Sequence, residues 1–93
     1  MTLQSTIRAS SDQVSSDLNG EAAILNLKSG VYFGLDPVGS TVWRMLAKPT
    51  TIGAVRDAML SRYEVEAEQC ERDLLELLTK LSQHGLVTIC DAS

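Results

Sequence analysis

Few side chains in this sequence could do chemistry, and their spacing argues against catalysis. The single histidine, His84, precedes Gly85 at the expected end of a helix, where a partly charged imidazole complements the helix dipole. Cys70 and Cys90 lie 20 positions apart without a CxxC pair, which favours two reduced, structural thiols over a disulfide or a metal site. A single histidine at the end of a helix does not allow a nucleophile and a general base to be paired. The sequence therefore predicts a protein that is not an enzyme and that uses no cofactor or metal.

The carboxylates are concentrated in one segment. Six of them accompany a single basic residue, Arg72, between positions 64 and 76. Helical spacing spreads these acidic side chains around a solvated face, and the first ones favour the positive N-terminus of a helix. We therefore expect an exposed helix surface rather than an acid/base pair or a cation site. The six residues are Glu64, Glu66, Glu68, Glu71, Asp73 and Glu76.

Length and charge limit the class of protein. Ninety-three residues with 44% hydrophobic content suit one small domain. No stretch approaches the roughly 20 apolar residues of a membrane span, and the N-terminus lacks the build of a secretory signal. A cytoplasmic protein without membrane contacts is expected. The net charge of −4 works against nucleic acid as a partner, because Lys and Arg contacts to phosphate supply most non-specific affinity.

The elements that position these residues begin with three predicted strands. Residues 14–18 lead into Asn19-Gly20, the dipeptide most typical of a two-residue type I′ hairpin turn. The side chains of residues 21–27 alternate between the two faces of a strand. One face can therefore pack on a core, while the other mixes polar and apolar residues. A three-residue loop of residues 28–30 then leads into residues 31–35, and a meander with this last strand at its edge is expected. The two faces of the middle strand are Ala23, Leu25 and Leu27 against Ala22, Ile24 and Asn26.

Three helices and a short strand follow. Asp36, with Pro37 behind it, caps a helix that ends near Lys48, and a threonine at position 50 or 51 caps a second helix over residues 52–63. The third helix spans about residues 67–84, and residues 86–90 form the last strand. The predicted fold is α+β, a three-stranded antiparallel β-meander packed on a three-helix bundle, similar to a winged helix-turn-helix. Before the domain of residues 14–93, residues 1–13 form an N-terminal arm, for which we favour a frayed tail over a short strand.

With these elements placed, the chain resembles the PqqD-like family, also described as RiPP recognition elements. These small domains capture the leader segment of a ribosomally made precursor peptide. Two stretches carry the resemblance, "NGEAAILNLKSGVYFGLDPVGSTVWRML" over residues 19–46 and "ERDLLELLTKLSQHGLV" over residues 71–87. Each motif by itself has low specificity for the family, whereas the order and spacing of the motifs together are specific. Asp36 is one departure, because asparagine is expected there about as often, and either residue caps the helix.

The resemblance implies a non-catalytic protein that binds a leader segment and delivers it to a maturation enzyme such as a radical SAM enzyme, a leader peptidase or a cyclase. It also implies that the leader adds as an antiparallel strand beside residues 31–35, in the cleft between that strand and the third helix. The binding candidates carried over are Val31, Tyr32, Phe33, Gly34 and Leu35 on the strand and Asp73, Leu74, Leu77, Leu78 and Leu81 on the helix.

The composition of residues 31–35 independently favours this strand as an edge to which a peptide can add. The strand of residues 31–35 contains no charge and no proline, the devices that usually protect an exposed edge from pairing. Two alternatives stay open. The apolar side chains of this strand could simply belong to the core, with the edge covered by the third helix or by a crystal or dimer mate, and the protein could be a winged-helix DNA-binding transcription regulator. The acidic third helix argues against DNA, because DNA readers place Arg, Lys, Asn and Gln there.

Overall fold

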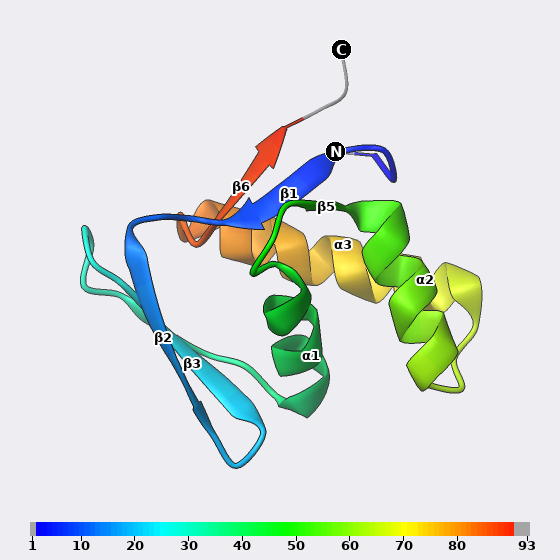
Figure 1. Ribbon diagram of the computed structural model, residues 1–93, viewed down its shortest axis with the longest axis horizontal. Helices are drawn as coiled ribbons and strands as arrows, with labels where there is room; N and C mark the ends of the chain where they lie inside the picture. Colours follow the sequence, from blue (N-terminus) through cyan, green and yellow to red (C-terminus); the bar gives the residue numbers. More distant parts are fainter. Residues whose placement is uncertain (1, 91–93) are drawn as a thin grey trace.

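The computed structural model describes residues 2–90 and contains two small antiparallel sheets and three helices within that range (Figure 1). The α+β class expected from the sequence is confirmed. The elements in chain order are β1 (Thr6–Ala9), β2 (Gln13–Leu18), β3 (Glu21–Asn26), β4 (Tyr32–Gly34), α1 (Pro37–Met45), β5 (Thr50–Thr51), α2 (Ile52–Arg62), α3 (Ala67–Gln83) and β6 (Val87–Cys90).

The first sheet is the predicted meander, in the order β2-β3-β4. Asn19 and Gly20 have φ values of 56° and 84°, which confirms the turn with two left-handed central residues. The buried face of β3 is the mixed one, with Ala22, Ile24 and Asn26. Asn26 can be buried because its side chain is fully engaged: Nδ2 donates to the His84 carbonyl at 2.7 Å, and Oδ1 accepts from two loop amides.

The loop between β3 and β4 is one residue longer than predicted. The Asn26 amide donates to the Val31 carbonyl at 2.9 Å, and the Gly30 amide donates to the Asn26 carbonyl at 2.8 Å. Asn26 and Val31 therefore close a four-residue loop, and the predicted three-residue loop closed by Leu27 and Val31 is wrong. The physical reason is the Asn26 side chain, which holds the amides of Lys28 and Ser29 and so stabilises the wider turn.

The second sheet joins segments that are far apart in the sequence, in the order β5-β1-β6. β1 pairs with β6 along its whole length, with Ile7 opposite Ile89, and Ile7 is 0% exposed. Residues 6–9 are therefore a strand of the fold, and the frayed tail that we favoured from the sequence is wrong. A four-residue alternation is too short to reveal a strand whose partners lie far along the chain. The last three residues of the predicted domain 14–93 lie outside the described residues.

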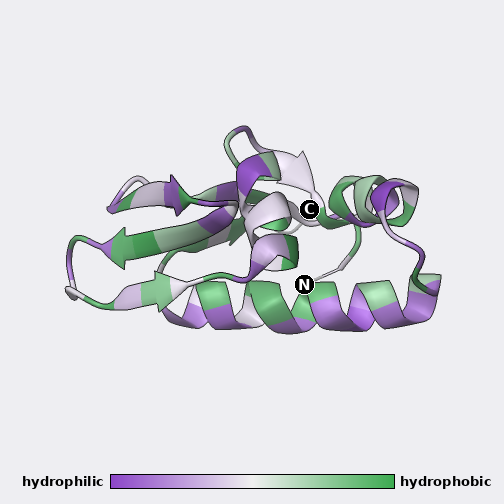
Figure 2. Cartoon of the chain, turned by 90° about the horizontal axis from the view of Figure 1, so that it is seen from below, coloured by the Kyte–Doolittle hydropathy of each residue, from purple (hydrophilic) through white to green (hydrophobic). Residues whose placement is uncertain are grey.

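α1 and α2 begin at their predicted capping residues and α3 ends before its predicted glycine, whereas α1 ends at Met45 rather than near Lys48. Asp36 Oδ1 accepts from the Gly39 amide at 2.7 Å, and Thr51 Oγ1 accepts from the Ala54 amide at 3.1 Å. Gly85, with φ of 69°, follows the end of α3. α3 turns its hydrophobic residues toward the meander and the other helices and its hydrophilic residues away from them (Figure 2). Trp43 of α1 is buried and belongs to the same core cluster as Val42 and Leu46.

Candidate functional site

β4 lies at one edge of the meander, and no other strand among residues 2–90 pairs with its outer side. The Val31 carbonyl accepts from Asn26, and the Leu35 amide donates to the Ala22 carbonyl at 2.8 Å. Because backbone groups alternate along an antiparallel strand, Phe33 also bonds inward, whereas Tyr32 and Gly34 direct their N–H and C=O groups at the free edge. The three-residue loop expected from the sequence would give the same alternation, because Val31 bonds inward in both registers.

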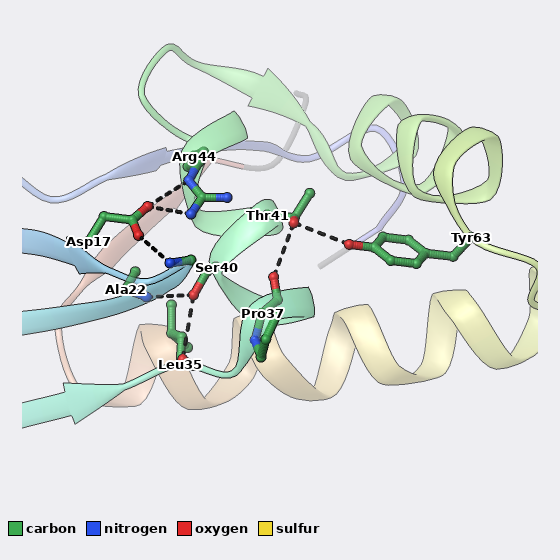
Figure 3. Close-up of polar contacts among 9 residues, drawn as sticks. Asp17, Ala22, Leu35, Pro37, Ser40, Thr41, Arg44 and Tyr63 are labelled. Carbon is green, nitrogen blue, oxygen red and sulfur yellow. Dashed lines mark hydrogen bonds and ion pairs between the residues drawn. The ribbon is translucent and has the colours of Figure 1, made fainter.

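α1 is held against this edge by a buried serine. Ser40 Oγ accepts from the Ala22 amide of β3 at 2.6 Å and donates to the Leu35 carbonyl at 3.4 Å (Figure 3). These bonds connect the first turns of α1 to the centre of the meander and to the residue that follows β4. These bonds fix the position of Val38 and Gly39, which line one side of a cleft next to β4.

A cleft of about 520 Å³ separates β4 and the start of α1 from α3. β4 is the strand of the meander nearest to α3 (Figure 2). The cleft runs beside the free edge of β4, so a strand paired there would lie over α3. Its lining consists of Phe33, Gly34, Leu35, Asp36, Val38 and Gly39 on one side and Asp73, Glu76, Leu77 and Lys80 on the other.

An almost entirely apolar pocket of about 240 Å³ continues the cleft toward α2. The two hollows share Val38, Asp73 and Leu77, and together we call them the α3 groove. Tyr63 closes the far end, where its hydroxyl lies 3.2 Å from Thr41 Oγ1 (Figure 3). The pocket is lined by Val38, Val42, Met59, Tyr63, Val65, Cys70, Asp73, Leu74 and Leu77.

The structure brings six of the ten predicted site residues together along the α3 groove. These are Phe33, Gly34, Leu35, Asp73, Leu74 and Leu77. Val31 and Tyr32 lie on or next to β4 but outside the groove, and Tyr32 is 68% exposed on the opposite face of the sheet. Leu78 and Leu81 are 0% exposed and belong to the core. They contribute no surface to the groove, because this part of the helical stripe belongs to the hydrophobic core, on a helix that packs against α2 and β6.

Several groove residues were missed by sequence reasoning. Val38 lies one helical turn before the buried Val42, and Tyr63 one turn after the buried Met59, yet Val38 is 47% exposed and Tyr63 is also exposed. Helical periodicity identifies the inward face of a helix but does not show where that face is left uncovered. The only available signal was the position of Val38 directly behind the capping Asp36, at the end of α1 that meets β4.

Two groups at the groove could take part in acid–base or nucleophilic chemistry, the Cys70 thiol and, behind Phe33, the His84 imidazole. Burial raises the pKa of the Cys70 thiol, and the charge of Asp73 raises it further, so this cysteine stays protonated at neutral pH and is a poor nucleophile. His84 packs its ring against Phe33, with centroids 5.3 Å apart. Within residues 2–90, no group of three or more His, Cys, Asp or Glu side chains could hold a metal ion.

Charges lie along the mouth of the groove and have local partners. Asp36 caps α1, Gln69 Nε2 donates to Asp73 at 2.9 Å, and Lys80 lies 3.9 Å from Glu76. The floor of the α3 groove is apolar, so the groove has a hydrophobic bottom and a polar rim. None of the helices in the described part of the chain has the length and apolar character needed to cross a membrane.

Two solved structures are similar to this chain over most of its length. TbiB1 in complex with the TbiA(beta) leader peptide is 35% identical, with a TM-score of 0.82, over 86% of this chain and 93% of that one. Lasso peptide synthetase B1 complexed with the leader peptide is 24% identical, with a TM-score of 0.78, over 88% and 96%, and supports the fold alone. The predicted likeness to a winged helix-turn-helix is not confirmed by these comparisons.

No curated protein sequence matches the chain. The family described as Coenzyme PQQ synthesis protein D (PqqD) matches residues 21–87. That range begins with β3 and ends at the first residue of β6, so it contains β4, α3 and every residue that lines the α3 groove. The chain therefore belongs to the PqqD family.

Proposed function

We propose that this protein binds the leader segment of a ribosomally made precursor peptide, without catalysis, by β-strand addition to β4. The single observation that carries the proposal is the free edge of β4 bordering the α3 groove. An edge strand with unpaired backbone groups and an adjacent groove has the two features that β-augmentation requires, one for affinity and one for specificity.

The geometry defines how such a segment would bind. Its backbone would pair with the N–H and C=O groups of Tyr32 and Gly34, and its side chains would alternate between the two faces of the extended sheet. Those on one face enter the α3 groove, where Leu77 and Val38 offer apolar contacts. Those on the other face lie next to the exposed ring of Tyr32. An extended peptide with apolar side chains at alternate positions suits this arrangement.

The relatives support the same partner. TbiB1 was solved with a leader peptide, and it shares 35% of its residues with this chain. We extend that binding to the present protein and, with it, the delivery of the bound precursor to a maturation enzyme such as a radical SAM enzyme, a leader peptidase or a cyclase. In this role the domain supplies recognition, and the partner enzyme supplies the chemistry.

Isothermal titration calorimetry tests the proposal directly. Two probes are used: the TbiA(beta) leader peptide, and the leader of a precursor encoded beside this gene. We expect one-to-one binding with Kd between about 10 nM and 10 μM, or roughly −11 to −7 kcal/mol. A peptide of the same composition in scrambled order serves as the control. The absence of heat and of NMR shift changes up to several hundred micromolar for both leaders would contradict the proposal.

The winged-helix DNA-binding alternative gains no support from the α3 surface. The exposed positions of α3 and its approach include Glu64, Glu66, Glu68, Asp73 and Glu76. Phosphates would be repelled by this side of the helix. We expect no shift of duplex DNA in a mobility assay at low salt, and tight, salt-sensitive binding there would reverse the ranking of the two functions.

A further inference from the structure

The meander has a second free edge, on β2. The two-residue turn makes Leu18 and Glu21 the closing hydrogen-bonded pair, and the Leu27 amide donates to the Asp12 carbonyl at 2.9 Å in the same ladder. The even-numbered residues of β2 therefore bond to β3. Gln13, Ser15 and Asp17 direct their N–H and C=O groups away from the sheet, where no strand among residues 2–90 pairs with them.

This edge lacks the usual protection against pairing. β2 has six residues, twice the length of β4, and contains neither proline nor lysine. Its one charged residue, Asp17, is already neutralised by an ion pair with Arg44 of α1 (Figure 3). Natural edge strands are normally short or carry several charges, prolines or bulges, so a long edge whose single charge is already paired points to a strand that covers it.

The side chain of Gln13 on β2 also favours a second molecule at this edge. Gln13 Oε1 is buried but has no hydrogen-bond partner within residues 2–90. It lines a hollow of about 540 Å³ between β2 and α1, which Trp43 and Arg44 also border. A buried carbonyl without a donor is destabilising, and native structures contain few of them. A donor from water or from another molecule can satisfy this oxygen.

The sequence of β2 is complementary to itself. An antiparallel pair with its two-fold axis at Ser15 places Gln13 opposite Asp17 of the second copy and engages all three free-edge residues. Any other two-fold register leaves one of them without a partner. No like charges oppose each other in this register, because the only carboxylate of the strand faces an amide.

The same register supplies the donor that Gln13 lacks. In each copy, the Nε and Nη2 atoms of Arg44 donate to the Asp17 carboxylate. When Asp17 of the second copy lies opposite Gln13, Arg44 of the second copy therefore also lies at the interface. The Nη1 group of Arg44 has no partner within the described residues, and the side chain is 49% exposed. Its N–H groups can therefore reach across the two-fold axis to Gln13 Oε1.

We propose that β2 pairs antiparallel with β2 of a second copy of this chain, joining two meanders into one continuous sheet. The symmetric contact is closed, so it produces a dimer rather than a filament. Each β4 lies at an outer edge of the joined sheet, and both α3 grooves stay open. One strand pair buries less than the roughly 1,200 Å² of a standard interface, so the dimer is weak and dissociates on dilution.

Sedimentation of the full chain between about 10 μM and 1 mM tests this interface. The mass is expected to rise from the 10.1 kDa monomer toward twice that value. Ser15→Pro removes the amide that faces the second copy and should weaken dimerisation at least tenfold while the protein stays folded. Ser15→Ala keeps the amide and should still dimerise. Ser16→Pro is the matched control, because its amide bonds to β3 and its loss should damage the fold.

Amide NMR shifts give a second readout that needs no variant and no leader peptide. On concentration, the amides of Gln13, Ser15 and Asp17 should shift, while those of Tyr32 and Gly34 should not. A chain that stays monomeric at about 1 mM overturns the proposal, as does a dimer in which the β4 amides shift instead. Ser15→Pro should bind the leader as the wild type does, so failure of leader binding and failure of dimerisation are separate results.

Discussion

Neighbouring leucines on α3 have different roles because they lie at different angles around the helix. Leu78 is 0% exposed and packs in the core, whereas Leu77 is half-buried and lines both parts of the α3 groove. The two residues are identical in type and adjacent in sequence, so they form a matched pair for separating stability from binding.

Leu78→Ala should lower the free energy of unfolding by about 2–5 kcal/mol, because it leaves a cavity under the sheet. Leu77→Ala removes contacts at the groove surface, so it should cost clearly less stability and weaken leader binding. Chemical denaturation measures the first effect and calorimetry the second. Normal binding by Leu77→Ala would show that the leader does not reach the α3 groove.

At the scale of elements, β4 combines one side that holds the sheet together with one side that is free. Gly34→Pro removes an amide that faces outward, and a Cβ at this position meets only the Tyr32 ring, at 3.9 Å. This variant should stay folded but bind the leader at least tenfold more weakly. Gly34→Ala keeps the amide and should bind normally. Melting curves and binding isotherms measure the two properties for each variant.

Phe33→Pro is the inverse experiment on the same strand. Its amide bonds to β3, so the substitution should damage the fold itself. Tyr32→Pro should behave like Gly34→Pro, with Tyr32→Ala as the control for the lost ring. Wild-type binding by a folded Gly34→Pro would show that β4 is not the edge to which the leader adds. Unfolding of Gly34→Pro together with a folded Phe33→Pro would invert the assigned hydrogen-bond pattern.

At the scale of the whole molecule, the second sheet connects the two ends of the described chain. β1 pairs with β6, which follows α3, and with β5, which precedes α2. The fully buried Ile7 anchors this sheet in the core. The N-terminal segment is therefore part of the cooperative unit, although it lies outside residues 21–87 that match the family.

Ile7→Ala should lower the free energy of unfolding by about 2–5 kcal/mol, and each kcal/mol should lower Tm by about 4–8 °C in a domain of this size. Arg8→Ala, at the exposed neighbouring position, should melt within a few degrees of the wild type. A thermal melt of both variants decides the point. Equal Tm values for the two would show that β1 adds little to the fold.

The sequence by itself determined the elements whose cause lies among adjacent residues. Asp36 and Thr51 cap their helices, Gly85 follows the end of α3, and Asn19-Gly20 forms the predicted turn. Each of these signals depends on hydrogen bonds or φ values within a few residues, so no tertiary information is needed to read it. The order of the meander, with β4 at its edge, followed from the same local signals.

Only the tertiary structure decided which residues those elements bring together. The β3–β4 loop is one residue longer because Asn26 Oδ1 holds the Lys28 and Ser29 amides, and Asn26 is held in place by its bond to the His84 carbonyl, 58 positions away. β1 became a strand because β5 and β6 supply its partners, and Leu77 and Val38 were left for the groove where nothing covers them while Leu78 was buried. Periodicity specifies the face of a helix or strand, but long-range pairing specifies what covers that face, because hydrophobic burial and ladder bonds depend on segments that are distant in sequence.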